Sequence, residues 1–582
     1  MKLIAEKGSV TNGIYGANTT GDIIALGGSV TLEAKGNVIN DIGHVYNYGD
    51  IIAIGDTVND QAGSGSITLK SHYGNVNNFD DFNVANSSET YGYNDENHGS
   101  ITSADERYNL ATSNITMSAV NGTIYNDKDY LVALGDITLE AKEGIGNSGE
   151  LFMAGGNITM GDTDGDLINN AKLISVDGDI TLNASNGSVV NMLAGDVFAL
   201  NGNVTFNAGA EADTNHSIYY VRVDQGEVIT TEISNHSIGD RIVVTEKGAD
   251  ANDNAITNIK YINDAGERVI LQTVTGEVEA FRKGDVVNRG DVIALNGNGV
   301  SNKGTVNFVS THGNVANYDD FNLVDGQSTY SHKGLTGYTL GSNTNNIKFN
   351  TGTIYAEDKG YILTDSDLTM KALEGYIYND MDIVSKKDVT LVSGKDLTIG
   401  TNVASIKSEG DVIVQSINGK VGLKKDSSVL SNNGDIVIDG NQGVDIVDGS
   451  TLEADKGSIS VVSTNGEVSV AKMFAGDMAN VGSNSGNVVI GEVQGKKVVL
   501  FSQGEDAKIN ADNIKVHDYL VLQGDDVALK EIDRSSNKGT LNVDVSGVNG
   551  GTMKGKLSLD LEDDVRFTTA NVADFCINSP DV

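Results

Sequence analysis

The stretch GDITLEAKEGIGNSGELFMAG, residues 135–155, recurs in degenerate form along the chain. Its opening phrase returns as GNITM at Gly156, GDITL at Gly178 and GNVTF at Gly202. A period of about 20–25 residues, made of short strands without a helical pattern, is typical of a solenoid. An asparagine that closes a short apolar run repeats at the same interval, in the series Asn126, Asn147, Asn169 and Asn191.

Each unit contains three short apolar runs separated by glycine-containing corners. In the first run Ile137 and Leu139 alternate with polar residues, which is the period of a strand with one buried face. Three such runs in 21–24 residues predict an all-β fold, a three-sided parallel β-helix. Parallel crossovers are nearly always right-handed, so we expect right-handed winding. Each coil would bury its apolar face only against its neighbours.

The repeated polar residues have a structural explanation. Asparagine side chains stacked at the coil spacing can hydrogen-bond to one another, so we expect a structural ladder rather than a ligand site. Corner aspartates such as Asp136 and Asp179 suit tight turns, and we expect them to be structural too.

The repeat divides the chain into four parts. We expect a β-helix over 1–209 with a polar excursion at 80–112, and a β-helix over 289–494 with an excursion at 319–346. Between them, 210–288 reads as an inserted antiparallel β module with a hairpin turn at NDAGE, residues 263–267. Residues 495–582 are either further coils or a β cap. The phrases SHYGNVNNFDDFN (71–83) and THGNVANYDDFN (311–322) indicate an internal duplication, with one excursion in each copy.

Composition narrows the class of protein. The 582 residues include 70 glycines, one proline, Pro580, and one cysteine, Cys576, so a disulfide framework and cysteine-based zinc sites are excluded. A formal charge of −40 would repel a phosphate backbone, so we expect no nucleic-acid partner. No apolar run is long enough for a membrane helix. The N-terminus reads as mid-repeat, and we expect a fragment of a longer protein.

We find no pattern that predicts catalysis, a cofactor or a metal. His72 and His312 occupy equivalent places in the duplication and are better explained as one repeated corner than as metal ligands. DTDGD (162–166) lacks the spacing of a known calcium loop, so a plain turn is favoured. The RGD tripeptide (289–291) would suit an integrin ligand, but its glycine and aspartate belong to the repeat and the equivalent copy reads YGD (48–50). We therefore attribute it to chance.

Repeats of the GDITLEA and GxIxN type, in an acidic chain nearly free of cysteine and proline, resemble the haemagglutinin-type filamentous exoproteins of Gram-negative bacteria. The chain looks closest to the leukotoxin-like filamentous adhesins. The resemblance implies export by two-partner secretion through an outer-membrane transporter, and a β-helical fibre that mediates adhesion. The secretion domain of that family carries an Asn-Pro-Asn-Leu motif, which a chain with Pro580 as its one proline cannot contain. The resemblance therefore covers the shaft, and no site residue of the family carries over.

These observations predict a non-enzymatic segment of a secreted or cell-surface adhesin that binds a receptor or glycan on host cells or other bacteria. Tyrosine supplies a large contact area at low entropic cost. We therefore expect receptor contacts at the tyrosines of the two excursions, Tyr91, Tyr93, Tyr330 and Tyr338. The alternatives are that the excursions only shield the shaft, that the chain is a β-helical polysaccharide lyase or hydrolase, and that it is a passive shaft for a C-terminal effector outside this chain.

Overall fold

The computed structural model places β-strands throughout the chain, and its contacts form two compact units. Unit 1 comprises Met1–Asn263, Arg268–Gly313 and Asp319–Leu363, and unit 2 comprises Asp264–Glu267, Asn314–Tyr318 and Thr364–Val582. Among the described residues no helix is long and apolar enough to cross a membrane. The structure describes residues 1–13, 21–37, 42–55, 65–79, 91–95, 99–103, 108–111, 113–162, 164–210, 217–224, 227–233, 236–252, 254–265, 267–296, 303–318, 330–340, 347–356, 361–400, 404–533, 541–561 and 565–578.

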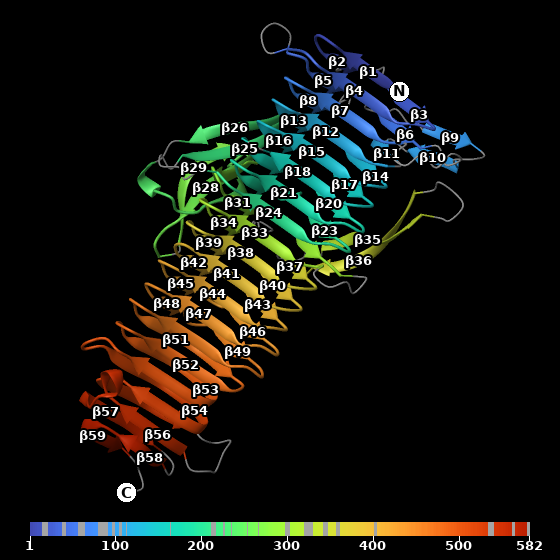
Figure 1. Cartoon of the computed structure of the whole chain (residues 1–582). Coiled ribbons are helices and arrows are strands. Elements are labelled where there is room, and N and C mark those ends of the chain that lie inside the picture. The colour runs from blue at the N-terminus through green and yellow to red at the C-terminus, as the bar shows by residue number, and fades with distance from the viewer. Residues whose placement is uncertain are drawn as a thin grey trace. The chain divides into compact units, whose positions relative to one another are not determined.

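Unit 1 is a parallel β-helix whose coils each contribute three strands (Figure 1). The first strands are β1 (Lys2–Ala5), β4 (Val30–Ala34), β7 (Ile67–Ser71), β12 (Ile115–Ala119), β15 (Ile137–Ala141), β18 (Ile158–Asp162), β21 (Ile180–Ala184), β24 (Val204–Ala208) and β33 (Val306–Ser310). The second strands are β2 (Val10–Asn12), β5 (Val45–Asn47), β8 (Val76–Asn78), β13 (Thr123–Asn126), β16 (Gly144–Asn147), β19 (Leu167–Asn169), β22 (Val189–Asn191) and β31 (Val286–Asn288). The third strands are β3 (Ile23–Leu26), β6 (Ile51–Ile54), β11 (Tyr108–Ala111), β14 (Tyr130–Ala133), β17 (Leu151–Ala154), β20 (Lys172–Ser175), β23 (Val197–Ala199), β32 (Val292–Ala294) and β37 (Tyr361–Thr364).

The coils stack in register, so that equivalent residues of the repeat lie directly above one another. Ile137 pairs with Ile158 and Leu139 with Met160, and all four are fully buried inside the coil. The threonine between them, Thr138, faces outward. This alternation confirms the predicted parallel β-helix, because every strand buries one face against the equivalent residues of its neighbours.

A ladder of buried asparagine side chains runs through unit 1, one per coil. At each step the Nδ2 of one asparagine donates to the Oδ1 of the next, over 2.6–3.0 Å. Several of these amides also donate to a carbonyl at the following corner, as Asn47 does to Gly49 and Asn169 to Ala171. The ladder is confirmed and is longer than predicted. Its members are Asn12, Asn47, Asn78, Asn126, Asn147, Asn169, Asn191 and Asn288.

The corner aspartates hydrogen-bond to the backbone of the next coil. Asp136 Oδ1 accepts the N–H of Asn157 at 2.7 Å, and Asp179 Oδ1 accepts the N–H of Asn203 at 2.9 Å. Each carboxylate therefore satisfies a backbone donor at a corner where the strand ladder is interrupted.

The glycine before each of these polar residues lets neighbouring corners approach closely. A Cβ on Gly202 would lie 1.8 Å from the carbonyl oxygen of Gly178. We expect Gly202→Ala to lower the free energy of unfolding by about 2–3 kcal/mol, because backbone rather than a mobile side chain would have to move. Gly161→Ala is the matched control, since a Cβ there meets nothing within 4 Å. Urea unfolding should separate the two variants, and equal midpoints would contradict the close stacking.

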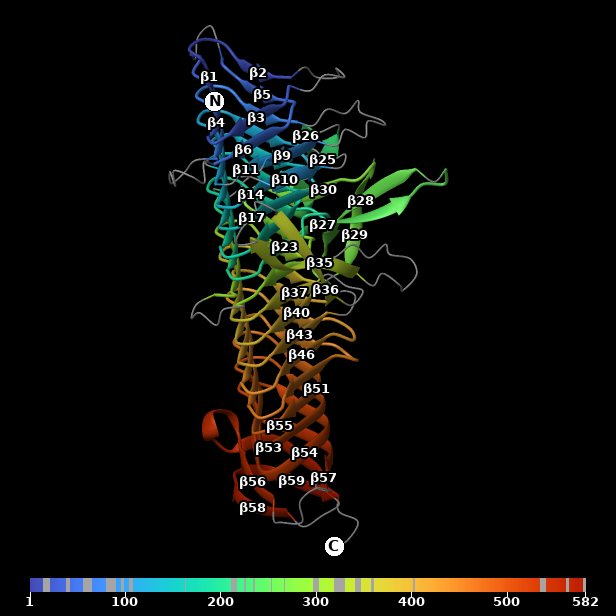
Figure 2. The same cartoon turned by 90° about the vertical axis from the view of Figure 1, so that its right-hand side faces the viewer.

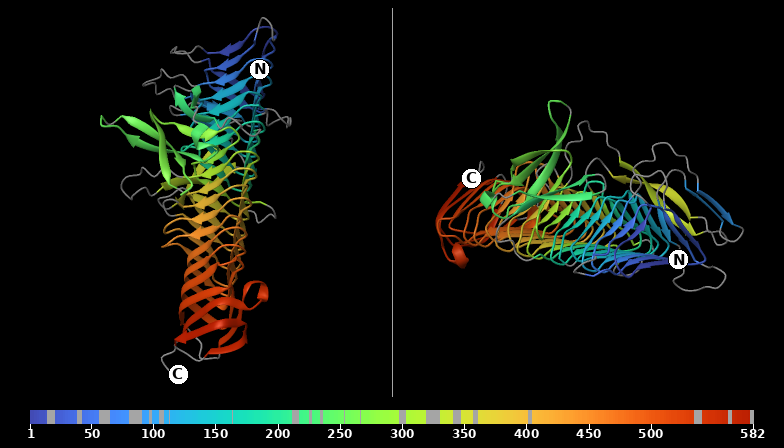
Figure 3. Two further views of the ribbon diagram at one scale, coloured as in Figure 1. Left: turned by 90° about the vertical axis from the view of Figure 1, so that its left-hand side faces the viewer. Right: turned by 90° about the horizontal axis from the view of Figure 1, so that it is seen from above.

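In the described part of the chain, antiparallel elements interrupt the coils at the module and at the two excursions. The module contains β25 (Ile218–Asp224), β26 (Glu227–Ile233) and β30 (Glu279–Arg282) in one sheet, and β27 (Val243–Ala249), β28 (Ala255–Ile262) and β29 (Arg268–Thr275) in another, with a short 3-10 turn at His236–Ile238. Figures 2 and 3 show the second sheet projecting from the coil strands. The predicted antiparallel module is confirmed. The first excursion also contains an antiparallel pair that the sequence did not predict, β9 (Tyr91–Asp95) with β10 (Gly99–Ser103). A second pair, β35 (Tyr330–Leu340) with β36 (Ile347–Ala356), begins in the second excursion and extends past its predicted end at residue 346.

Unit 2 repeats the three-strand coil. Its first strands are β38 (Leu368–Ala372), β41 (Val389–Ser393), β44 (Val412–Ser416), β47 (Ile436–Gly440), β50 (Ile459–Ser463) and β52 (Met478–Ser483). The second strands are β34 (Val315–Asn317), β39 (Ile377–Asn379), β42 (Leu397–Ile399), β45 (Val421–Leu423) and β48 (Val444–Ile446), and the third strands are β40 (Asp382–Ser385), β43 (Ser405–Ser408), β46 (Ser428–Ser431) and β49 (Thr451–Ala454).

Within unit 2 apolar residues replace the asparagines of the ladder. Asn317 donates to Asn379 at 2.6 Å, but the next positions in that column are Ile399 and Leu423. Serines at the ends of the first and third strands, which unit 1 also has at Ser71 and Ser175, make the polar contacts that continue in unit 2. Ser416 Oγ, for example, accepts the N–H of Gly419 and donates to the carbonyl of Lys395.

The C-terminal part of unit 2 continues as parallel coils with longer strands. Its strands are β51 (Val468–Ala475), β53 (Val488–Ser502), β54 (Lys508–Gln523), β55 (Asp526–Asp533), β56 (Leu541–Ser546), β57 (Met553–Leu561), β58 (Val565–Ala570) and β59 (Val572–Asn578), with a 3-10 turn at Val548–Gly550. β51 pairs in parallel with both β48 and β49 and therefore spans two faces of a coil. β53 pairs in parallel with both parts of β51 and with β52, so it spans all three faces. Of the two expectations for 495–582, the parallel pairing favours further coils.

Candidate functional site

The tyrosines predicted to contact a receptor lie on the two excursion hairpins. The backbones of Tyr91 and Tyr93 belong to β9, and those of Tyr330 and Tyr338 to β35. The register places Tyr93 opposite Ile101 and Tyr338 opposite Phe349. The side chains of these strands lie outside the described part of the structure, so the predicted contacts stay a prediction.

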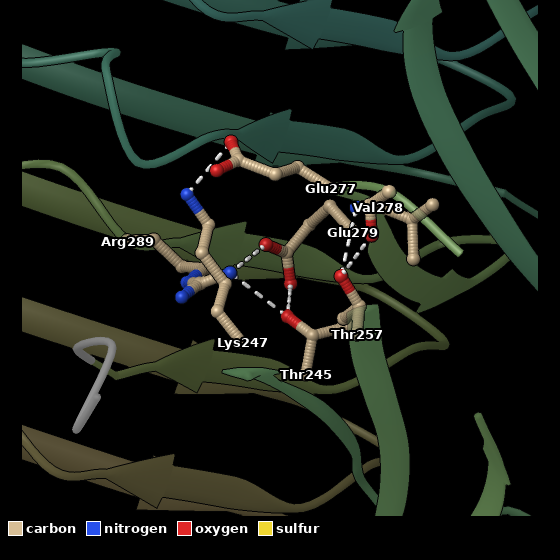
Figure 4. A network of polar contacts seen from close by, with 8 residues as sticks. Thr245, Lys247, Thr257, Glu277, Val278, Glu279 and Arg289 are labelled. Carbon is tan, nitrogen blue, oxygen red and sulfur yellow. Dashed lines mark hydrogen bonds and ion pairs between the residues drawn. The ribbon is translucent and has the colours of Figure 1, made fainter. Parts of the chain in front are cut away.

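The inserted module is held to the coil by a buried ion pair (Figure 4). Arg289, which follows β31 of the coil, places its Nη1 2.6 Å from Glu279 Oε2 on β30. The same Nη1 donates to Thr245 Oγ1 on β27 at 2.9 Å, and that hydroxyl donates to Glu279 Oε1 at 2.7 Å. Both charged side chains are 1 % exposed. One network therefore ties two strands of the module to the coil.

The return of the module to the coil is fixed by Ser188. Its hydroxyl donates to the carbonyl of Arg282 at 2.8 Å and accepts the N–H of Gly284 at 2.9 Å. Asp285 Oδ2 accepts the N–H of Arg282. The C-terminal junction of the module is therefore hydrogen-bonded to a corner of the coil.

This network also accounts for the RGD tripeptide. Arg289 is buried in its pair with Glu279, and Gly290 is buried as well. An integrin would need the arginine side chain exposed, so the folded chain cannot present this tripeptide. The attribution to chance agrees with the structure.

The acidic and histidine motifs form no metal centre in the described residues, where no three histidine, cysteine, aspartate or glutamate side chains gather at ligand distance. His72 Nε2 instead contacts Glu33 Oε1 at 2.9 Å, and this hydrogen bond lowers the pKa of Glu33. In DTDGD, Asp162 Oδ1 accepts the N–H of Gly165 at 2.5 Å, which is the bond of a turn.

Asp162 is nevertheless unusual, because it lies inside the coil. It pairs in register with Ala141 and Ala184 and is 3 % exposed. Burial raises the pKa of this carboxyl to about 6. The folded state therefore binds the proton more tightly than the unfolded chain, whose carboxyl keeps a value near 3.8. The free energy of unfolding should fall as pH rises from about 4 to about 6, by at most about 3 kcal/mol.

Asp162→Ser should remove this pH dependence. Serine occupies the same column at Ser71, where its hydroxyl accepts the N–H of Gly74 and so makes the same turn bond without a charge. We expect the variant to be more stable than the wild type at pH 7.5, with a difference that shrinks toward pH 5. Urea unfolding across this range tests the sign. A difference that grows on acidification would contradict a raised pKa.

Sequence reasoning missed two features of unit 1. The first is the Arg289 network, whose members lie up to 44 residues apart and share no motif. The second is a row of aromatic side chains on the outer face of β5. The sequence HVYNY (44–48) signals it through rings at alternate positions, which a strand directs to one face.

Comparison with known protein families, with curated proteins and with solved structures finds no match to this chain.

Proposed function

We propose that this chain is a non-enzymatic segment of a secreted or cell-surface adhesin, in which stacked coils form a scaffold and the antiparallel elements bind a receptor or glycan on host cells or other bacteria. An outer-membrane transporter would export the full-length protein, as the sequence resemblance implies. An acidic chain of net charge −40 favours partners other than nucleic acid.

The observation that carries the proposal is the continuity of the ladder across the insertions. Asn78 donates to Asn126 across the first excursion, and Asn191 donates to Asn288 across the module. The donor–acceptor distances of these two bonds are 2.6 and 2.8 Å. Between coils without an insertion the corresponding distances are 2.7–3.0 Å. Large insertions therefore leave the coil register unchanged, and a scaffold that tolerates them can display binding surfaces without losing stability.

The test compares binding of the full chain and two deletion variants to epithelial cells and co-resident bacteria. One variant replaces residues 80–107 and 319–360 with short Gly-Asn turns. The other replaces 211–283 with such a turn, which the coil permits because a Cβ on Gly284 would lie 3.2 Å from that of Ala210. Circular dichroism establishes that all three fold.

We expect the hairpin deletion to abolish cell binding. Loss of binding in the module deletion alone would move recognition to 210–288. Absence of binding by the full chain would contradict the adhesin proposal and favour a passive scaffold for an effector elsewhere.

A further inference from the structure

The outer face of the second strands carries a row of rings that we call the aromatic row, consisting of His44, Tyr46, Tyr48 and Phe79. Successive ring centroids are 5.7, 6.3 and 6.0 Å apart. The planes of Tyr46 and Tyr48 lie within 5° of parallel. All four side chains are partly exposed. Tyr46 lies on β5, His44 and Tyr48 flank that strand, and Phe79 follows β8 in the next coil. The ladder bond from Asn47 to Asn78 fixes the backbone beneath the row.

The first ring of the row is an uncharged imidazole. His44 Nδ1 accepts the backbone N–H of Asn75 at 2.9 Å, so the ring proton of the neutral form lies on Nε2. Burial also lowers the pKa of His44. At neutral pH the row therefore presents aromatic surface without a cation.

Beside the row, Asn77 occupies an outward position on β8 between two tyrosines. It pairs in register with Tyr46 on β5 and with Tyr125 on β13. Its side chain is 6 % exposed, and its amide forms no hydrogen bond within the described part of the chain. Neither amide atom is among the fully buried polar atoms that lack a partner, so solvent reaches the amide. The neighbouring Asn78 faces inward instead, and its amide forms two ladder bonds. An amide that reaches solvent and that the described protein does not use is open to hydrogen bonds from a ligand.

We propose that Asn77 and the aromatic row form a binding site for a neutral saccharide. The electron-rich ring faces suit the C–H groups of a pyranose, and the row offers several such rings in sequence. The amide of Asn77 can donate to and accept from sugar hydroxyls. The neutral His44 and the net charge of −40 disfavour an anionic ligand. This inference goes beyond the proposed function, because the site lies on the coil strands and not on the antiparallel elements.

The module borders this site. The next residue in the column of Asn77 and Tyr125 is Gly146, and a Cβ there would lie 2.5 Å from Cγ2 of Val228 on β26. β26 of the module therefore packs over this column at Gly146, and the proposed saccharide site lies beside it.

The duplication supplies a natural substitution for the test. In the aligned phrases SHYGNVNNF and THGNVANY, Ala316 stands where the first copy has Asn77. Asn77→Ala therefore introduces the residue that the second copy already has. Because the Asn77 amide makes no hydrogen bond to the described protein, we expect this variant to keep the thermal midpoint of the wild type.

The experiment measures binding of the full chain to an immobilised panel of neutral oligosaccharides built from hexoses and N-acetylhexosamines, with a heparin hexasaccharide as the anionic comparison. We expect the wild type to bind at least one neutral member. Asn77→Ala and Tyr46→Ala should each weaken that binding roughly tenfold or more. Tyr130→Ala is the matched control, since Tyr130 lies on a third strand and its hydroxyl donates to Glu150.

Each outcome decides the inference. Absence of binding to every neutral member, preference for heparin, or unchanged binding by Asn77→Ala overturns the saccharide site. If the full chain still binds cells in that case, the adhesin proposal stands without this site. If the panel binds in an Asn77-dependent way but cells do not, the saccharide site stands and the adhesin proposal fails.

Discussion

Replacing Asn147 with alanine should cost about 2–6 kcal/mol of the free energy of unfolding. The change removes the acceptor of Asn126 and the donor to Asn169, so two buried amide groups lose their partners at once. Each such loss costs about 1–3 kcal/mol. The measurement is the urea midpoint of the variant, followed by circular dichroism.

Asn183→Ala is the control for this variant. Asn183 points outward from β21 and hydrogen-bonds to Ser185, so its loss should cost less than about 0.5 kcal/mol. Equal midpoints for the two variants would show that the ladder contributes nothing beyond its side-chain volume.

In unit 2, beyond Asn379, the column that holds the asparagine ladder in unit 1 is apolar. This difference explains why Asn147→Ala is costly although the column accepts apolar residues elsewhere. Ile399, Leu423 and Ile446 occupy consecutive coils where unit 1 has asparagines. An apolar residue next to apolar residues leaves no amide without a partner. An apolar residue inserted between two asparagines leaves one on each side, and the penalty arises from these neighbours.

Replacing Arg289 with alanine should cost about 3–5 kcal/mol, because it leaves the carboxylate of Glu279 buried without its cation. We expect the loss to be local, with the module detaching from its coil while the ladder stays intact. Limited proteolysis should then cut within 210–288 faster than in the wild type, whereas the coils stay protected.

The double variant Arg289→Met/Glu279→Met separates the charge from the packing. Removing both partners leaves no unpaired buried charge, so most of the lost stability should return. If the double variant were as unstable as Arg289→Ala, the ion pair would not be what makes the single change costly.

The sequence predicted the features of this protein that depend on neighbouring coils. The period, the inward Ile137 and Leu139, and the asparagine ladder all follow from residues that recur about 22 residues apart. The strands of the module were predictable from local alternation, since IYYVRV and RVILQTV each form a strand. In both cases the deciding contacts are local or repeat with the coil.

The features that the sequence did not predict depend on contacts between unrelated positions. Arg289 is buried because Glu279 and Thr245, which lie on two different strands of the module, both contact its guanidinium group. Asp162 is the exception, since it takes the repeat position of Ala141 and Ala184, and it was missed because the DTDGD motif was interpreted as a turn. Asn77 and Asn78 are identical in the sequence, so the sequence does not show that only the Asn78 amide bonds to other asparagines.

The most direct test of the account is hydrogen exchange at the asparagine side-chain amides, measured by NMR on the full chain. The scaffold claim requires the ladder amides of Asn126, Asn147 and Asn169 to be hydrogen-bonded between coils. We expect their Nδ2 hydrogens to exchange far more slowly than those of the outward Asn183. Equal exchange at all four residues would contradict the ladder, and with it the registered coil on which the proposed display of binding surfaces depends.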